Sequence, residues 1–181
     1  LRQVNPRLIY CSITGFGQHG PYAARAGYDF MIQGMSGLMS ITGDPQGEPT
    51  KVGVAFADVF TGLHAVIGIT SALYHRERTG EGQFVDLSQF ETIASVVGPA
   101  LLDILVNKST IAPFGNRSQE APAAPHGVYR CAGDDRWCAI TIFTEEEWQG
   151  FCRAMGNPTW AQDVRFATLH ARVAHQNELD S

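Results

Sequence analysis

The hydrophobic positions change their spacing several times along the chain. β-Branched and aromatic residues cluster at 8–14 and again at 83–87, which predicts two buried strands. Between them, apolar side chains recur every three or four positions over 57–76, which predicts the longest helix of the chain. The segments 27–40 and 91–106 also carry apolar residues at helical spacing. We therefore expect strands and helices to alternate over this part of the chain.

The longest predicted helix has two different faces. Large side chains such as Val59, Leu63 and Leu73 form an apolar face. Small residues line a neighbouring face: Gly62, Ala65, Gly68 and Ala72. Because glycine lowers helix propensity, these positions predict close packing against another part of the backbone.

The second half begins after a loop at 109–125 that contains three prolines and no regular pattern. Such a stretch predicts a domain boundary, with one domain at 1–112 and a second part at 113–181. Beyond it, the segments 127–131 and 137–142 alternate as the two strands of a hairpin do. Thr144 and the three glutamates that follow it predict a capped helix, and a polar helix is expected at the end.

Composition excludes several classes of function. The 181 residues carry a net charge of −5, so no basic surface predicts a nucleic-acid partner. Four cysteines without paired spacing predict neither a metal site nor a disulfide framework, and favour a reducing, cytoplasmic location. No apolar run approaches the roughly 20 residues of a membrane span, so no membrane partner is expected. The chain opens without Met, and we expect an upstream segment.

Asp58 is the candidate with the clearest physical argument. It lies in the first turn of the longest predicted helix, close to Phe56 and Phe60. The helix dipole and free N–H groups would favour the ionised carboxylate, and apolar neighbours would remove water from it. A carboxylate of this kind can act as a nucleophile. An ordinary capping aspartate would occupy the same position, so the residues alone leave both interpretations open.

A series of motifs follows in one consistent order through nearly the whole chain. They are Asn5-Pro6-Arg7-Leu8-Ile9-Tyr10, Gly15-Phe16-Gly17, Gly20-Pro21-Tyr22, Gly27-Tyr28-Asp29, Gly37-Leu38-Met39-Ser40, the helix with Asp58, Arg78-Thr79-Gly80-Glu81-Gly82-Gln83 and Pro125-His126-Gly127. In this order they resemble the family III CoA-transferases, a superfamily with formyl-CoA and carnitine CoA-transferases and α-methylacyl-CoA racemases. The resemblance implies an α/β fold of which this chain is an internal fragment.

The resemblance also implies domains and roles. Residues 1–112 would be the C-terminal part of the large, Rossmann-like CoA-binding domain, and 113–181 a linker with the start of a small α+β domain. Asp58 would attack an acyl-CoA, and the CoA would pass to a free carboxylic acid. CoA and acyl-CoA would thus be substrates, with no permanently bound cofactor. The segment beside the CoA pantetheine arm, near Asp58 in space, would be Ala26, Gly27, Tyr28 and Asp29. Two subunits would form a homodimer.

Two alternatives to CoA transfer stay open. The related racemases carry His where Tyr28 lies, and tyrosine, with a reference pKa of about 10, is a poor base at neutral pH, which favours transfer. The other alternative is a truncated, inactive remnant that acts as an assembly module, so activity of the fragment itself stays open. The glycines at 15, 17 and 20 imitate a dinucleotide fingerprint, against which Pro21 argues. Arg117 could pair with a dicarboxylic acyl group, which we treat as a hypothesis.

Overall fold

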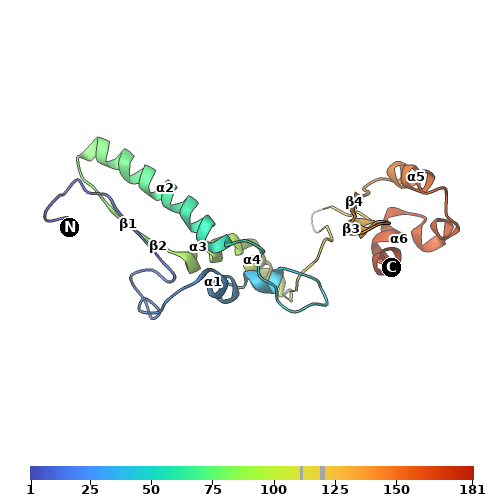
Figure 1. Cartoon of the computed structure of the whole chain (residues 1–181), viewed down its shortest axis with the longest axis horizontal. Helices are drawn as coiled ribbons and strands as arrows, with labels where there is room; N and C mark the ends of the chain where they lie inside the picture. Colours follow the sequence, from blue (N-terminus) through green and yellow to red (C-terminus); the bar gives the residue numbers. More distant parts are fainter. Residues whose placement is uncertain (111, 119–120) are drawn as a thin grey trace. The chain divides into compact units, whose positions relative to one another are not determined.

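The computed structural model describes residues 1–110, 112–118 and 121–181 (Figure 1). The chain divides into two compact units, Leu1–Pro113 and Phe114–Ser181. This division falls one residue beyond the boundary expected from the sequence. The assignment of the first unit to a CoA-binding domain stays a prediction.

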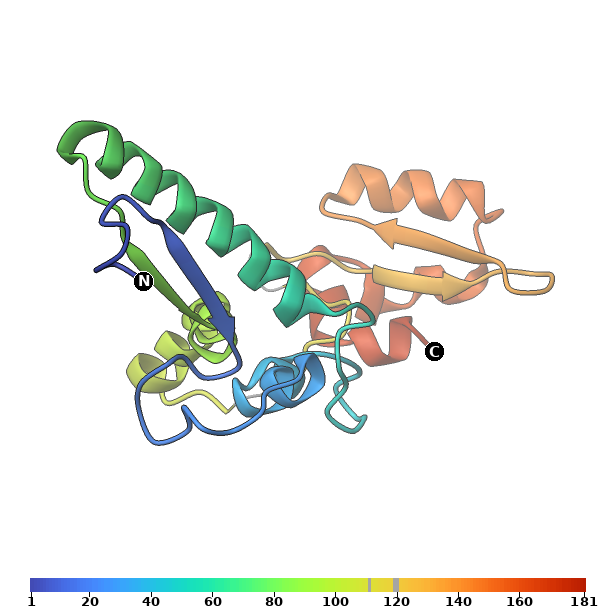
Figure 2. The ribbon, with the colours of Figure 1, turned by 60° about the vertical axis from the view of Figure 1, so that its left-hand side comes forward.

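A parallel pair of strands organises the first unit. Strand β1 (Tyr10–Thr14) pairs with β2 (Phe84–Ser88), in register from Tyr10 opposite Phe84 to Thr14 opposite Ser88. Helix α2 (Phe56–Thr79) lies in the crossover between them and runs along the sheet (Figure 2). The Tyr10 and Phe84 rings stack on each other at 5.4 Å and stay half exposed. Both strands and the long helix form within three residues of their predicted bounds.

The small-residue face of α2 is the face that packs on the sheet. Ala65 and Ala72 are buried. A Cβ atom on Gly68 would lie 2.9 Å from Val85 Cγ1 of β2, so the glycine permits the close approach that the sequence predicted. The large apolar side chains lie on the other side of the helix, 56–64% exposed: Val59, Leu63, Val66, Ile67 and Tyr74.

The expectation that no segment approaches a membrane span is wrong for α2. By length and composition this helix could cross a membrane, and the bent pair of α3 (Gln89–Val96) and α4 (Gly98–Asn107) passes the same test if it counts as one span. Apolar side chains on the exposed face raise the mean hydropathy of α2, although His64 and charged residues interrupt it. This is weak evidence, because core helices of soluble proteins pass the same test.

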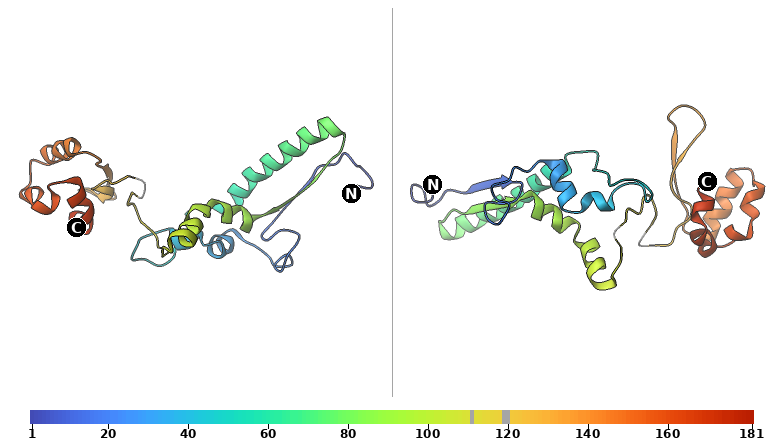
Figure 3. Two further views of the ribbon diagram at one scale, coloured as in Figure 1. Left: turned by 180° about the vertical axis from the view of Figure 1, so that it is seen from behind. Right: turned by 90° about the horizontal axis from the view of Figure 1, so that it is seen from below.

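Two segments predicted as single helices are each broken. In 27–40, helix α1 (Asp29–Met35) ends before the 3-10 helix η1 (Leu38–Ile41), because Gly37 between them has a φ of 84°. In 91–106, α3 and α4 meet at an angle of 60° (Figure 3). Pro99 lies in the first turn of α4, where its ring and missing N–H prevent the preceding helix from continuing.

A small core joins the helices of the first unit. Its buried residues come from the loop after β1, from α1, η1, α2 and α3, and from the residue between α3 and α4: Phe16, Ile32, Leu38, Ala57, Ile93 and Val97. Because Ala57 and Ile93 lie in the first and second turns of their helices, this core holds the starts of α2 and α3 against α1.

The second unit begins with the predicted hairpin. Strands β3 (His126–Arg130) and β4 (Trp137–Thr141) pair in antiparallel register from His126 opposite Thr141 to Arg130 opposite Trp137. Gly133 and Asp135 in the connecting turn have φ values of 107° and 46°, a conformation that glycine and aspartate tolerate best. The hairpin prediction is confirmed.

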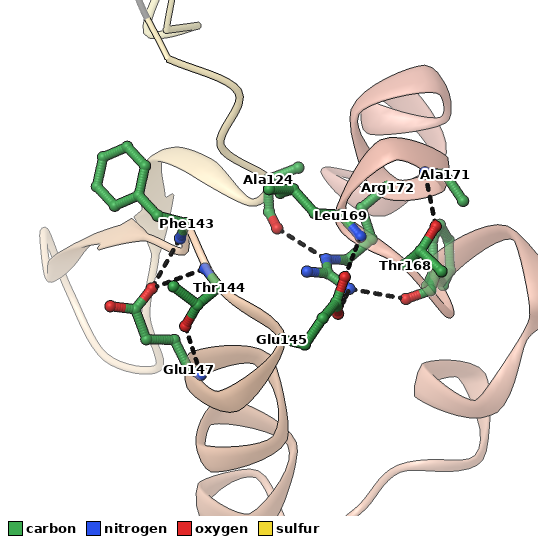
Figure 4. Close-up of polar contacts among 10 residues, drawn as sticks. Ala124, Phe143, Thr144, Glu145, Glu147, Thr168, Leu169, Ala171 and Arg172 are labelled. Carbon is green, nitrogen blue, oxygen red and sulfur yellow. Dashed lines mark hydrogen bonds and ion pairs between the residues drawn. The ribbon is translucent and has the colours of Figure 1, made fainter.

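Short helices follow the hairpin in the second unit, and Ile140 of β4 packs against a buried cluster that includes Trp148 and Phe166. These helices are α5 (Glu145–Ala154), η2 (Thr159–Gln162), η3 (Val164–Phe166), α6 (Leu169–Ala174) and α7 (Gln176–Leu179). The capping box predicted for α5 is present: Thr144 Oγ1 accepts from the Glu147 N–H at 3.1 Å, and Glu147 Oε2 accepts from the Thr144 N–H at 3.1 Å (Figure 4).

Arg172 lies fully buried at the centre of the second unit. Its Nε donates to the Ala124 carbonyl at 3.0 Å, and its Nη1 donates to Glu145 Oε2 at 2.9 Å and to the Phe166 carbonyl at 3.1 Å (Figure 4). Its guanidinium also lies 4.6 Å from the centre of the Trp148 ring. One side chain thus joins the loop before β3 to α5, η3 and α6.

Candidate functional site

Asp58 is the third residue of α2, at the N-terminal end where the sequence placed it. Its Oδ1 accepts a hydrogen bond of 2.5 Å from Gln89 Nε2. The side chain is exposed within this chain. The expectation that Phe56 and Phe60 remove water from the carboxylate is wrong here. Their rings stack at 5.3 Å against the core, and Asp58, two residues from each, lies on the opposite side of the helix.

The N-terminus of α2 is capped by Asp29 from a distant part of the chain. Asp29 Oδ1 accepts from the N–H of Ala57 at 2.7 Å and from the N–H of Asp58 at 3.4 Å. Ala55 occupies the N-cap position and has no side-chain oxygen, so the cap comes from α1 instead. The N–H groups of Ala57 and Asp58, which the sequence interpretation treated as free, are therefore used within the fold.

The Gln33 side chain connects the Asp29 carboxylate to the loop before α2. This side chain is completely buried, and its Nε2 donates to Asp29 Oδ2 at 2.7 Å. Its Oε1 accepts from the Val52 N–H at 2.9 Å, and its Nε2 also reaches the Val54 carbonyl at 3.4 Å. The amide thus fixes the chain that enters α2. No sequence pattern indicates this role, because a glutamine on an apolar helix is usually exposed.

Two glycines bring the predicted CoA-binding segment to the end of β1. A Cβ atom on Gly27 would lie 2.5 Å from the Cα of Gly15, so the two backbones are in direct contact and neither position accepts a side chain. The Gly15 carbonyl accepts from the Phe90 N–H of α3 at 3.0 Å. The starts of α1, α2 and α3 therefore converge around Asp58.

The residues predicted to bind CoA differ in their surroundings. Ala26 is exposed, and Tyr28 is 62% exposed with its ring stacked on Phe30 at 6.5 Å. Tyr28 directly precedes Asp29, whose carboxylate contacts the Asp58 backbone, so the structure brings this segment beside the N-terminus of α2. The carboxylate of Asp29 serves as a cap. CoA binding by the segment stays a prediction.

Arg117 is held within the second unit. Its Nη2 donates to Asn177 Oδ1, and the side chain is exposed. Its proposed pairing with a dicarboxylic acyl group stays a prediction. Across residues 1–110, 112–118 and 121–181, no three His, Cys, Asp or Glu side chains are grouped as metal ligands would be.

Comparison with known proteins identifies the family. The sequence model of CoA-transferase family III matches residues 1–181. The chain belongs to this family. It is 43% identical over 179 residues to a succinate–glutarate CoA-transferase of Agrobacterium fabrum, covering 99% of this chain and 44% of that protein. It is 38% identical over 180 residues to an acetyl-CoA:oxalate CoA-transferase of Acetobacter aceti, covering 99% and 45%.

A solved structure supports the same family. The crystal structure of a CAIB/BAIF family protein from Brucella suis matches with a TM-score of 0.91 and 44% identity, over 99% of this chain and 46% of that one. The expected fold class, an α/β fragment of the family fold, is confirmed. The chain spans about half the length of the curated relatives it matches.

Proposed function

We propose that Asp58 is the nucleophile of an enzyme that transfers CoA from an acyl-CoA to a free carboxylic acid through a covalent aspartyl intermediate. The observation that carries the proposal is the convergence at Asp58. Its backbone is fixed by Asp29, one carboxylate oxygen is held by Gln89, and the segment containing Tyr28 lies beside it. A nucleophile fixed in this way attacks without first losing rotational freedom.

The proposed reaction conserves the thioester without ATP. Asp58 Oδ2 attacks the thioester carbonyl, the carbon–sulfur bond breaks, and CoA leaves as a thiolate. The product is a mixed anhydride between Asp58 and the acyl group. The thiolate then attacks Cγ of Asp58, releases the first carboxylate and forms an aspartyl-CoA thioester. A second carboxylate accepts the CoA by the reverse of these steps. Covalent capture divides one difficult exchange into easier ones.

Dicarboxylic acids are the proposed substrate class. The relatives at 43% and 38% identity are named for succinate, glutarate and oxalate, all of which are short dicarboxylic acids. A second carboxylate on the acyl group needs a cationic or hydrogen-bonding partner. Arg117 supplies a candidate, since among the described residues its exposed guanidinium donates to the neutral amide of Asn177.

The decisive test is made in the full-length protein with Asp58→Asn. This variant preserves the shape of the side chain and an acceptor for Gln89, and it removes the nucleophile. Transfer between succinyl-CoA and glutarate should fall to background. Hydroxylamine should attack the activated Cγ of Asp58 and leave a hydroxamate in the wild type alone, detected as a mass change on the peptide that contains residue 58. Asp134→Asn, at an exposed turn position, is the matched control. Retained turnover in Asp58→Asn would end the proposal.

We further propose that the protein forms a homodimer, is located in the cytoplasm and does not associate with a membrane. The exposed apolar face of α2 requires cover by protein. Sedimentation of the full-length protein without detergent tests both points. A monomer, or a requirement for detergent, would contradict them.

The two alternatives have their own tests. A racemase would exchange deuterium into the α-carbon of a 2-methylacyl-CoA, and Tyr28 argues against this because tyrosine is a poor base at neutral pH. The inactive remnant is distinguished by calorimetric titration of the 181-residue chain with CoA. Heat of binding supports a functional fragment. Its absence, with the full-length protein also inactive, favours the assembly module.

A further inference from the structure

Gln89 is a largely buried polar residue whose backbone position is closely defined. It is the first residue of α3, directly after β2, and only 9% of it is exposed. The preceding Ser88 ends the strand opposite Thr14, and its Oγ accepts from the Glu91 N–H at 3.2 Å. The strand register and this helix cap therefore fix the backbone from which the amide reaches Asp58.

The direction of the hydrogen bond to Asp58 follows from its chemistry. An ionised carboxylate only accepts hydrogen bonds, so the Gln89 amide presents its N–H to Oδ1 at 2.5 Å. An amide is neutral, so it supports the negative charge without neutralising it. Because Oδ1 is held, Oδ2 is the oxygen that remains available for attack on a thioester.

We propose that Gln89 is a catalytic hydrogen-bond donor that stabilises the negative charge formed on Asp58 Oδ1 when CoA thiolate attacks Cγ. This rests on the proposed function. In the mixed anhydride, Oδ2 bridges to the acyl group and Oδ1 is the carbonyl oxygen. Attack forms the sulfur–Cγ bond and moves the electron pair to Oδ1. Collapse restores the carbonyl and breaks the Cγ–Oδ2 bond, so the first carboxylate leaves with Oδ2.

Oδ1 therefore stays on Asp58 through the cycle and carries the charge again when the second carboxylate attacks the aspartyl thioester and expels the thiolate. A preorganised donor to a developing oxyanion typically contributes about 10²–10³-fold in kcat. A donor that the fold already holds at Oδ1 needs no rearrangement at the moment of reaction.

The test uses Gln89→Met in the full-length protein, because methionine has a similar length and no N–H donor. We expect kcat to fall about 10²-fold or more while the KM for acyl-CoA changes less than about threefold. Mass spectrometry of quenched reactions should show acyl-Asp58 accumulating relative to the CoA thioester of Asp58, because the step at Cγ is the slowed one. Gln46→Met, at an exposed loop position, is the control and should behave as the wild type.

A second variant provides a pH profile of activity, which would not change if the role of Gln89 were merely structural. Gln89→Glu should be almost inactive at neutral pH and regain activity as the pH falls, because a pair that shares one proton restores an O–H donor to Oδ1. The wild type should show no such gain over the same pH range. A kcat for Gln89→Met within about threefold of the wild-type value would overturn the role of Gln89. An equal loss of acyl-Asp58 and of the CoA thioester of Asp58, together with a lower Tm, would overturn it as well. If the wild type forms no adduct and Asp58→Asn stays active, the proposed function itself fails.

Discussion

Replacing Arg172 with methionine should remove a large part of the stability of the second unit. Methionine fills a similar volume and keeps the apolar stem, so the substitution removes the guanidinium and little packing. The Ala124 and Phe166 carbonyls would lose their buried donor, which costs about 1–3 kcal/mol for each. The contact over Trp148 would be lost as well, worth roughly 0.5–2 kcal/mol.

The two partners of the ion pair differ in their exposure to solvent, and this difference determines the loss of stability expected for each substitution. The Glu145 side chain is 52% exposed, so water can solvate it once Arg172 is gone. We therefore expect a loss of about 3–5 kcal/mol for Arg172→Met, mostly from the carbonyls. Glu145→Gln leaves a buried cation without its counter-charge while keeping one acceptor, so a loss of roughly 2–3 kcal/mol is expected. Small domains have free energies of unfolding of about 5–15 kcal/mol, so either loss is large.

Tryptophan fluorescence isolates this unit during urea denaturation. All three tryptophans of the chain, at 137, 148 and 160, lie in the second unit, and Trp148 lies directly under Arg172. A lower midpoint with an unchanged m-value would report lost stability rather than a changed unfolded state. Arg130→Met, at an exposed strand position, is the matched control. A loss below about 1 kcal/mol for Arg172→Met would refute the reasoning about its buried carbonyl partners.

The same ion pair predicts a pH dependence. Partial burial raises the pKa of the Glu145 carboxyl, but hydrogen bonds from Arg172 and the Leu169 N–H outweigh it and leave that pKa below its ordinary value. The carboxylate therefore stabilises the fold above the pKa it has in the unfolded chain, and this stability is lost as pH falls through the lower folded pKa. The difference between wild type and Glu145→Gln should shrink over that acidic range. A difference that is independent of pH would contradict the assignment.

Further predictions concern the packing and caps described above. Gly68→Ala should destabilise the first unit although alanine favours helices, because its Cβ would lie 2.9 Å from Val85 Cγ1. Gly62→Ala on the same helix has no atom within 4 Å and should stabilise by about 0.5–1 kcal/mol, and equal effects in thermal unfolding would refute the packing argument. Asp29→Ala should cost about 1–2 kcal/mol by uncapping α2, with reduced hydrogen-exchange protection confined to its first turn. Thr144→Ala should cost about 1 kcal/mol in urea denaturation, and Thr144→Ser should restore most of it.

Features encoded by neighbouring residues were predictable from the sequence. The strands at 10–14 and 84–88 and the hairpin follow from short runs of hydrophobic residues, and the cap of α5 follows from Thr144 and Glu147. The break between α3 and α4 also has a local cause in Pro99, but the apolar residues continue across it, and their spacing suggested one helix.

Features encoded by residues far apart were not predictable. Asp29 was assigned to CoA binding, and only the fold shows that its carboxylate caps a helix beginning 27 positions later. Arg172 lies in a polar segment and gave no signal of burial, because arginine is mostly exposed in proteins. The exposure of the large apolar face of α2 could not be read from its periodicity, since periodicity identifies a face and not what covers it.

The cap on α2 has a consequence for protein engineering. A designer who transplants the helix of Asp58 onto another scaffold would move the proposed nucleophile without the groups that orient it. Its backbone is held from α1, its entering loop is held by the Gln33 amide, and its carboxylate is held from α3. The smallest portable unit is therefore three discontinuous segments, in which Asp29, Asp58 and Gln89 must keep their mutual spacing within a fraction of an ångström.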